Sequence, residues 1–451
     1  MNFRKKGDKL VVIPIELYQR EMYTRLYLAL TLVESGYDVL ICDRLNPILH
    51  DINGGVVFYK DHAIWSEKYL EKFKNQGMKL VLHDAEGLII LDENRYLNSR
   101  VSKKVIDMAD AILCWGHNQL NLFDKKSGHE KFHLSGDPRF DIARKLISND
   151  TKKNKIKNIL INTRFTYVNP KGKQDIVPSF KKLGYIQNQQ DEDNFRELIN
   201  NDQNIFSEFL SLIEIARNSD FNIIIRPHPS EDHDFYHKYI DTNIKVDAHT
   251  PINEQIEWAD CVIHDGCTTA LEARAQNKIV LGLRPKLKGH VYDSYANKFS
   301  FENFHSSNEL IEWVTKFELG NIDLVSELDV SEDIYNFSNK NPLFSDVLKS
   351  TLDSIVINEY TIKSRANKQY IKEKIRKISI IMSEVFPYIK GNGFIVSSKR
   401  YDSHFRKLDH KKVRNMCDEI INKYIENGVG YDINYVNDKA FVLSSQTPES
   451  K

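Results

Sequence analysis

The sequence predicts an α/β protein built from two doubly wound domains, and three observations support this fold class. Short apolar, β-prone runs alternate with amphipathic helical segments twice along the chain. The two series are separated by a polar stretch rich in lysine and asparagine, residues 148–157. With 451 residues, of which 41% are hydrophobic, the chain is long enough to bury two full cores. We therefore expect two Rossmann-like domains, followed by a helical C-terminal extension.

The first series of elements covers residues 1–147. Its first strand is predicted at 10–15, and the amphipathic helix that follows, at about 21–35, ends before Gly36, a residue type that suits a helix C-terminus. Further apolar runs predict the remaining strands at 37–42, 56–59, 78–83, 111–115 and 132–134.

The second series covers residues 158–320, with residues 148–157 as the linker. It begins with a strand at 158–162 and a long helix at about 192–218. Later apolar runs predict strands at 221–225, 261–263 and 278–283. Two similar domains of this kind leave a cleft between facing strand ends, which is the architecture of the GT-B nucleotide-sugar enzymes. Residues 321–451 are predicted to form the helical, basic C-terminal extension.

One motif of the second domain, residues 264–273 (HDGCTTALEA), points to an anionic ligand. It follows a strand, so that Gly266 lies in the turn and Thr268 and Thr269 open the next helix with two hydroxyls and free backbone N–H groups. Glu272, one turn into the helix, is placed to accept hydrogen bonds from a ribose. Two threonines at a helix start are also consistent with ordinary capping.

The other motif, residues 226–230 (RPHPS), also follows a strand. Arg226 supplies a permanent cation and His228 a donor that can carry charge near neutral pH, while Pro227 and Pro229 stiffen the backbone. His-Pro alone is a common dipeptide. On consecutive strand ends, however, the two motifs together predict a nucleotide phosphate site. Its candidate binding residues are Arg226, His228, Pro229, Gly266, Thr268, Thr269 and Glu272.

Two carboxylates of the first domain are candidates for catalysis. Asp84 and Glu86 stand at the end of strand 78–83, and Gly87 permits a tight turn that exposes both. A carboxylate there could act as general base towards an acceptor hydroxyl or as a nucleophile at an anomeric carbon. Alternatively, Asp84 caps the turn and Glu86 is solvated.

Two further strand-end segments carry polar groups. Residues 136–141 (GDPRFD) follow the last strand of the first domain and fit either a catalytic role or a structural hinge. Residues 162–164 (NTR) end the first strand of the second domain, where a contact with donor or acceptor is expected.

Composition indicates a cytoplasmic enzyme and excludes a general nucleic-acid binder. Lysine plus arginine and aspartate plus glutamate each number 63, so the formal net charge is zero. The five cysteines have no CxxC spacing, which favours reduced thiols over disulfides or a zinc site. We find neither a secretory h-region nor an apolar run of membrane-spanning length. The basic stretch 363–414 fits a solvated surface, and it also fits peripheral attraction to anionic lipids at the inner face of the plasma membrane.

Taken in order along residues 11–283, these motifs resemble the bacterial surface carbohydrate (capsule and O-antigen) biosynthesis family. That family is similar to GT-B transferases that use CMP-activated nonulosonic acids or Kdo. The resemblance implies that His228 contacts the CMP phosphate and assists its departure, that Thr268 and Thr269 hold it and that Glu272 binds the nucleoside. It also implies that Glu86 or Asp84 is the catalytic carboxylate. Ala85 departs from the family's acidic motif by separating the two acids, which leaves open which of them is catalytic.

The resemblance predicts a glycosyltransferase that moves a nonulosonic acid from its CMP donor to a glycan or lipid-linked glycan acceptor. Pseudaminic and legionaminic-type sugars come ahead of sialic acid and Kdo as donors. No cofactor and no metal are expected, and the stereochemical outcome stays open. The alternatives are a CDP-glycerol or CDP-ribitol phosphotransferase of the teichoic type, a UDP-sugar 2-epimerase, and a non-catalytic GT-B scaffold for capsule assembly.

Overall fold

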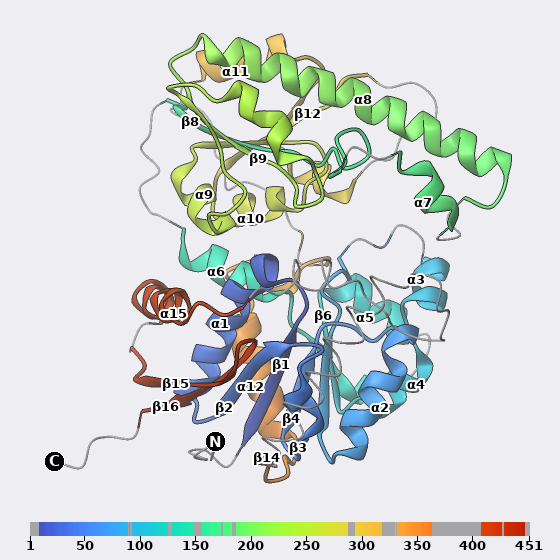
Figure 1. Ribbon diagram of the computed structural model, residues 1–451, viewed down its shortest axis with the longest axis vertical. Helices are drawn as coiled ribbons and strands as arrows, with labels where there is room; N and C mark the ends of the chain where they lie inside the picture. Colours follow the sequence, from blue (N-terminus) through green and yellow to red (C-terminus); the bar gives the residue numbers. More distant parts are fainter. Residues whose placement is uncertain are drawn as a thin grey trace, which may run out of the picture. The chain divides into compact units, whose positions relative to one another are not determined.

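The computed structural model divides into two compact units (Figure 1). Unit 1 contains the described residues of 1–142 and 329–451, and unit 2 those of 143–328. The predicted first and second domains end at 147 and 320, a few residues from these divisions. The described residues are 9–88, 90, 93–124, 129–147, 155–172, 175–182, 186–286, 294–317, 330, 332–362, 407–425 and 428–446.

Unit 1 is built on an eight-stranded sheet with the order β15-β16-β2-β1-β4-β5-β6-β7. From β1 the chain adds β2 on one side of the sheet and then β4 and its successors on the other side. The strand order therefore reverses between β1 and β4, which makes this the switch point of the sheet. Almost all residues of the parallel strands are buried, as expected for a sheet covered by helices on both faces. These parallel strands are β1 (Leu10–Ile15), β2 (Asp38–Asp43), β4 (Val56–Tyr59), β5 (Lys79–His83), β6 (Ala111–Cys114) and β7 (Phe132–Leu134).

Helices cover both faces of this sheet. On one face, apolar residues of α2 (Glu67–Asn75), α4 (Lys103–Met108) and α5 (His117–Asp124) share a core with the strands. The other face is covered by α1 (Tyr18–Glu34), with α12 (Phe344–Ser354) packed beside it. Helix α3 (Glu93–Ser99) lies in the same unit, and α6 (Pro138–Lys145) spans the division between the two units.

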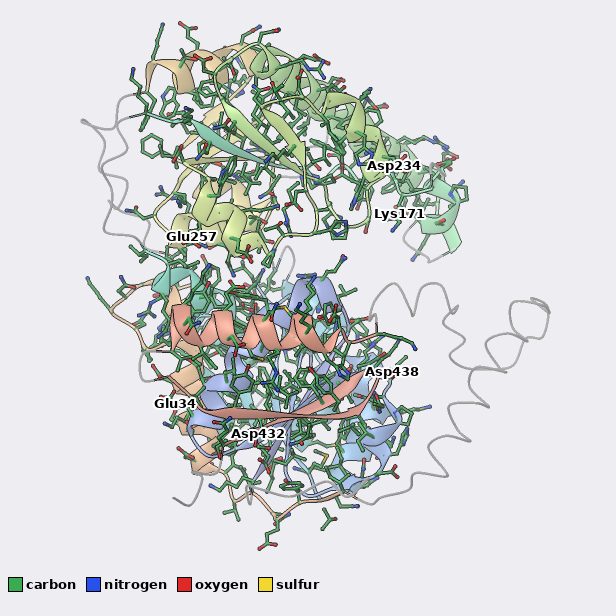
Figure 2. All side chains as sticks on the ribbon, turned by 60° about the vertical axis from the view of Figure 1, so that its left-hand side comes forward. Glu34, Lys171, Asp234, Glu257, Asp432 and Asp438 are labelled. Carbon is green, nitrogen blue, oxygen red and sulfur yellow. The ribbon has the colours of Figure 1, made fainter. Side chains whose placement is uncertain are left out.

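The C-terminal part of the chain completes unit 1, and its described residues contain strands as well as the predicted helices. Strands β15 (Tyr431–Asn437) and β16 (Ala440–Ser445) form a hairpin, and β16 pairs antiparallel with β2. Helix α15 (His410–Tyr424) packs against α1, and Figure 2 shows it running beside the hairpin that Asp432 and Asp438 mark. The physical reason is that an unpaired β2 would leave an open sheet edge, which the apolar residues of β16 cover.

A short antiparallel pair ties another returning segment to unit 1. Strand β14 (Thr361–Ile362) pairs with β3 (Ile52–Asn53). Most of the predicted basic stretch, residues 363–406, lies outside the described residues, and only its end enters α15. Within the described ranges, every helix is too short or too polar to cross a membrane.

Unit 2 is built on a six-stranded, fully parallel sheet with the order β10-β9-β8-β11-β12-β13. From β8 the chain moves outward to β9 and β10 and then crosses to β11, so the switch point lies between β8 and β11. Its strands are β8 (Asn158–Asn162), β9 (Asn222–Arg226), β10 (Ile244–Val246), β11 (Cys261–His264), β12 (Ile279–Leu283) and β13 (Glu302–Phe304).

The sheet of unit 2 also lies between two helical layers. One core joins α8 (Gln189–Arg217) and α11 (Ser307–Lys316) to the isoleucines that point to their side. On the other face, α9 (Ile252–Trp258) and α10 (Thr269–Ala275) pack on the alternate residues of the strands. A further helix, α7 (Val177–Lys182), precedes α8. The predicted fold class, two doubly wound α/β units, is thus confirmed.

Candidate functional site

Three polar side chains lie in a row across the carboxyl ends of the central strands of unit 2. Asn162 ends β8 and is the register partner of Arg226 at the end of β9. The parallel pairing of β11 with β8 places His264 on the other side of Asn162. Each follows by two residues a side chain that packs under α9 and α10, namely Leu160, Ile224 or Val262, so all three point to that face of the sheet. The row therefore stands at the switch point, where open α/β sheets bind ligands.

The side-chain amide of Asn162 is buried without hydrogen-bond partners. Its side chain is 2% exposed, yet neither its Oδ1 nor its Nδ2 has a hydrogen-bond partner. Burying an amide without hydrogen bonds is unfavourable, and buried polar groups in proteins almost always have partners. Asn162 thus presents one unused acceptor and unused donors that a bound molecule would satisfy.

Arg226 is a cation held by only one of its guanidinium nitrogens. Its Nη1 donates to Thr250 O at 2.7 Å and to Gln255 Oε1 at 2.6 Å. Among the described residues, no hydrogen bond uses its Nε or Nη2. Burial lowers the pKa of Arg226, while the carboxylates of Asp247 and Glu272 oppose that shift. The structure thus brings Arg226 and the predicted Glu272 together, and Glu272 is itself 5% exposed in α10.

A chain of alternating charges fixes the loop after β11. Arg164 donates from Nη2 to Asp265 Oδ2 and from Nε to Asp265 O, both at 2.5 Å. The same guanidinium lies 3.4 Å from Asp202 Oδ1, and Arg284 Nε lies 3.5 Å from Asp265 Oδ1. Burial raises the pKa of Asp202. In the part of the chain that the structure describes, no three histidine, cysteine or acidic side chains are grouped so that they could hold a metal ion.

Two residues of this series of ion pairs, Arg284 and Asp202, were not predicted from the sequence. Arg284 directly follows a predicted strand, so the strand-end criterion applied to the other motifs would have found it. Asp202 lies on the buried side of the amphipathic helix α8, at 2% exposure, and an acid on an apolar stripe was the available signal.

The turn before α10 uses the backbone N–H groups of Gly266 and Cys267 within the loop. Gly266 adopts a φ of +69° and donates its N–H to Asn297 Oδ1 at 2.7 Å. The N–H of Cys267 is directed to His264 Nδ1 at 3.3 Å. Thr268 is the N-cap residue but makes no side-chain capping bond, and Thr269 Oγ1 accepts from Cys267 Sγ at 3.3 Å. The hydroxyl of Thr268 is therefore available to a ligand.

The loop after β9 presents the imidazole of His228 with a defined tautomer. His228 and Pro229 are exposed. Ser230 donates its N–H to His228 Nδ1 at 3.2 Å, so a neutral ring carries its proton on Nε2. The buried carboxylate of Glu231 holds the loop, accepting from His228 N at 3.1 Å and from Thr163 Oγ1 at 2.7 Å. Glu231 was not predicted, although it directly follows the RPHPS motif.

The two candidate carboxylates of unit 1 differ in their surroundings. Asp84 is 1% exposed and accepts from Glu86 N at 3.0 Å, Tyr96 Oη at 3.0 Å and Arg100 Nη2 at 2.9 Å. Burial opposes ionisation, but the charges of His62 and Arg100, with these hydrogen bonds, lower the pKa of Asp84. The side chain of Glu86 is 58% exposed and paired with Arg100 at 2.9 Å. Asp84 thus caps its turn, as the alternative interpretation expected, while Glu86 faces solvent.

The segment 136–141 anchors the returning C-terminal segment of unit 1. Asp141 accepts from Phe344 N at 2.7 Å, Ser345 N at 2.8 Å and Asn336 Nδ2 at 2.7 Å. Asn336 also accepts from Asp137 N at 3.0 Å. Burial raises the pKa of Asp141 to about 6. These contacts give the segment a structural role.

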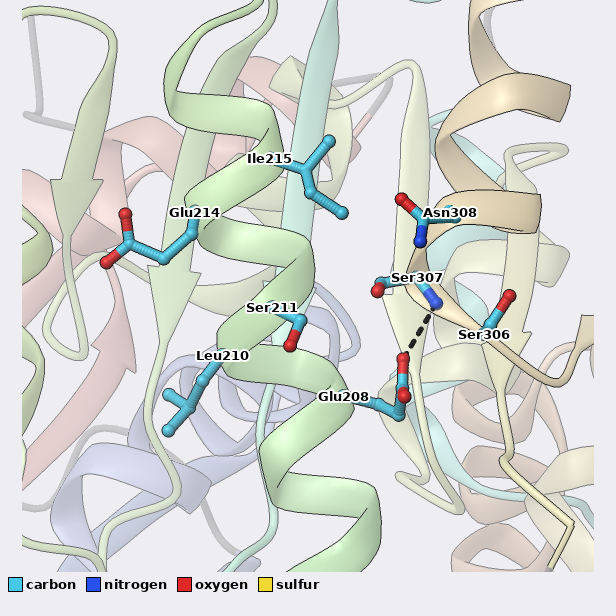
Figure 3. A pocket seen from close by; sticks show the side chains of 8 residues that line it. All are labelled: Glu208, Leu210, Ser211, Glu214, Ile215, Ser306, Ser307 and Asn308. Atoms are coloured by element: carbon cyan, nitrogen blue, oxygen red, sulfur yellow. Dashed lines mark hydrogen bonds between the residues drawn. The ribbon is translucent and has the colours of Figure 1, made fainter.

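A separate groove of about 590 Å³ lies between α8 and α11 (Figure 3). Glu208 Oε2 accepts the N–H of Ser307 at 2.9 Å across it, at the start of α11. None of the predicted site residues lines this groove. Its lining residues are Glu208, Leu210, Ser211, Glu214, Ile215, Ser306, Ser307 and Asn308.

Comparison with known proteins gives structural likenesses without a sequence family. No model of a known protein family matches the chain, and no curated protein matches it. One similar solved structure is a putative UDP-N-acetylglucosamine 2-epimerase from Listeria monocytogenes, with 12% identity and a TM-score of 0.44 over 86% of this chain and 100% of the other. The UDP-GlcNAc 2-epimerase from Neisseria meningitidis bound to UDP-GlcNAc has 13% identity and a TM-score of 0.43 over 77% and 99%. The Methanocaldococcus jannaschii enzyme in complex with UDP-GlcNAc and UDP has 12% identity and a TM-score of 0.40 over 70% and 94%.

These comparisons overturn the predicted CMP-dependent transferase and its CMP-activated nonulosonic acid donor. The three similar structures are those of UDP-GlcNAc 2-epimerases, and two of them hold UDP-GlcNAc. The physical reason for the error lies in the motifs that carried the resemblance. An arginine, a histidine and threonine hydroxyls at strand ends interact with phosphate, whichever base or sugar is attached to it. They therefore carried no information on the nucleotide or on the transferred sugar.

Proposed function

We propose that the protein is an enzyme that acts on a nucleotide-activated sugar, with the nucleotide phosphates bound in unit 2 at the carboxyl ends of β8, β9 and β11. The observation that carries this proposal is the buried, unpartnered amide of Asn162 beside the guanidinium of Arg226, of which only Nη1 is hydrogen-bonded among the described residues. Unsatisfied buried groups are costly, and a bound ligand at a strand-end site is one way in which native proteins satisfy them.

The donors and acceptors of the site favour a nucleotide sugar over a simple anion. Phosphate oxygens would accept from Arg226 Nε and Nη2, from the hydroxyl of Thr268 and from Asn162 Nδ2. Asn162 Oδ1, in contrast, needs a donor, which a ribose or sugar hydroxyl supplies and a fully ionised phosphate does not. A ligand with anionic oxygens and neighbouring hydroxyls satisfies both requirements.

The same groups suit cleavage of the bond between the anomeric carbon and the phosphate. When that bond breaks, negative charge develops on the departing phosphate, and fixed donors aimed at it stabilise the transition state. Arg226 is fixed through Thr250 and Gln255 before any ligand arrives. His228 presents Nε2–H from the neighbouring loop and would assist the departing charge. Arg226 and His228 are the residues to which we assign this stabilisation.

Calorimetric titration of the full chain tests the proposal. The ligands are UDP, UDP-GlcNAc, UMP, CDP, CMP, GDP and inorganic phosphate, and the variants are wild type, Arg226→Met and Arg217→Met. Arg217→Met is the matched control, because it removes the same guanidinium group at the C-terminal end of α8, where Arg217 pairs with Glu214. We expect at least one nucleoside diphosphate to bind wild type and Arg217→Met alike, and to bind Arg226→Met about 10- to 100-fold more weakly. Absence of nucleotide binding, or equal affinity in both variants, would contradict the proposal.

A further inference from the structure

Unit 1 carries an exposed aromatic side chain in a polar setting. Trp65 lies in the 3-10 turn Ile64–Ser66 that follows β4, and 58% of it is exposed. The neighbouring Ile64 is 49% exposed. Leaving an indole in water forgoes the stabilisation that its burial would give, so an exposed tryptophan beside a second large apolar side chain marks a candidate binding surface.

A fixed guanidinium lies against this indole. The Arg100 guanidinium carbon is 5.6 Å from the centre of the Trp65 ring. Its Nη1 and Nη2 each donate at 2.9 Å, to Glu86 and to Asp84 respectively. Its Nε is buried and has no hydrogen-bond partner. Because Tyr96 donates a hydrogen bond to Asp84, the buried Asp84 carboxylate is fixed and in turn fixes the orientation of Arg100.

The exposed groups of this surface match a particular ligand chemistry. Trp65 offers an apolar ring face and Glu86 an exposed carboxylate that accepts hydrogen bonds, while Arg100 holds Glu86 beside the indole. A pyranose has an apolar C–H face that packs on an aromatic ring, and its hydroxyls both donate and accept. An anionic surface fits less well, since Asp84 and Glu86 outnumber the single cation Arg100.

We propose that Trp65, Arg100 and Glu86 form a saccharide-binding surface on unit 1, with the sugar ring packed on the Trp65 indole, its hydroxyls bound by Glu86, and Glu86 held in place by Arg100. Asp84 is a positioning residue that holds Arg100 in place. This surface is independent of the nucleotide site of unit 2, and the two proposals succeed or fail separately.

Saturation-transfer NMR and tryptophan fluorescence on the full chain test this proposal, with methyl β-D-glucopyranoside and methyl N-acetyl-β-D-glucosaminide as probes. Wild type is compared with Trp65→Ala, Glu86→Gln and Ile240→Ala. Ile240 is the control, because it is 51% exposed and lies in unit 2. Each substitution is at an exposed position, so the fold is expected to persist, and circular dichroism verifies it.

We expect saturable binding of at least one glycoside to wild type, with a blue shift of the tryptophan emission. Trp65→Ala abolishes the binding, Glu86→Gln weakens it by about five- to tenfold, and Ile240→Ala leaves it unchanged. No saturable binding up to the solubility limit, or binding that Trp65→Ala retains, would overturn the proposal. Vesicles of phosphatidylcholine and phosphatidylglycerol form a separate arm, and Trp65-dependent binding to them without glycoside binding would also overturn it.

Discussion

Replacing Asn162 by leucine separates a structural from a ligand-binding role, because the two roles predict opposite signs for stability. Leucine is close to asparagine in shape, and Asn162 is 2% exposed at the end of β8. Since neither Oδ1 nor Nδ2 has a partner, the substitution breaks no hydrogen bond in the ligand-free protein. We therefore expect Asn162→Leu to stabilise the ligand-free protein and to weaken nucleotide binding.

The magnitude follows from the burial of the amide. Burying such a group without a hydrogen bond costs about 1–3 kcal/mol in proteins, and leucine removes that cost. For a unit of this size, each kcal/mol shifts the melting temperature by about 2–4 °C, so the midpoint of unit 2 should rise by about 2–12 °C. In the complex, the loss of one hydrogen bond to phosphate and one to a hydroxyl weakens binding by at least about 10-fold.

Calorimetric unfolding of the ligand-free protein and titration with UDP give both numbers on one sample. Asn222→Leu is the matched control, because Asn222 begins β9 at the opposite edge of the same sheet and donates from Nδ2 to Asn158 Oδ1 at 2.9 Å. The control should lose stability and keep its affinity. If Asn162→Leu lowers the melting temperature, or raises it without weakening binding, the reasoning from the unpartnered amide is refuted.

Three further predictions concern stability. Gly136→Ala should destabilise unit 1 by about 3–6 kcal/mol, because a left-handed backbone (φ +76°) and three hydrogen bonds of Asn336 would be disturbed by a Cβ that lies 2.7 Å from Asn336 N. Gly36→Ala is the control, because Gly36 also has a left-handed backbone (φ +85°) but no atom lies within 4 Å of an added Cβ, so only the backbone cost of about 1–2 kcal/mol applies. If urea unfolding shows equal losses of stability in the two variants, segment 136–141 does not have the anchor role. Burial lowers the pKa of His83 to about 4 and that of His264 to about 3. Because the unfolded chain binds these protons near pH 6.5, stability present above pH 6.5 is lost as pH falls towards 4, by up to about 3 kcal/mol for His83. Asp141, whose pKa is raised to about 6, gains stability as pH falls through that value and offsets part of this loss. Denaturant unfolding from pH 7 to 4.5 should therefore show a smaller loss of stability in His264→Gln than in wild type, and equal losses would contradict the prediction. Arg164→Met should cost about 3–5 kcal/mol, because it removes the cation beside the buried Asp202 and one of the two cations beside Asp265. Arg217→Met removes only partly exposed ion pairs with Glu214 and Asp241, so it should cost less than Arg164→Met.

Local patterns predicted the parallel cores of both units well. The run 158–162 was expected as a strand and is β8 to the residue, because its isoleucines and leucine are buried on both faces. The helix expected at 192–218 is α8, Gln189–Arg217. Its start differs because the N-cap Asn188, which accepts from Asp191 N at 2.9 Å, adds a turn before the amphipathic stretch.

Local sequence patterns could not predict which strands pair when they lie far apart in the chain. Strand β16 lies beside β2, nearly 400 residues earlier in the chain, and nothing in 440–445 alone indicates that partner. The same holds for the site. Strand-end position brought out Arg226, Thr268 and Asp84, but their roles depend on distant groups such as Gln255 and Arg100, which no local spacing reveals.

Hydrogen exchange with mass spectrometry on the full chain, with and without UDP, tests most directly whether unit 2 binds the nucleotide at its strand ends. We predict that UDP slows exchange in peptides covering residues 162–166, 226–231 and 264–270, and that Arg226→Met removes this protection at the same UDP concentration. Protection confined to unit 1, or unchanged in Arg226→Met, would contradict the account.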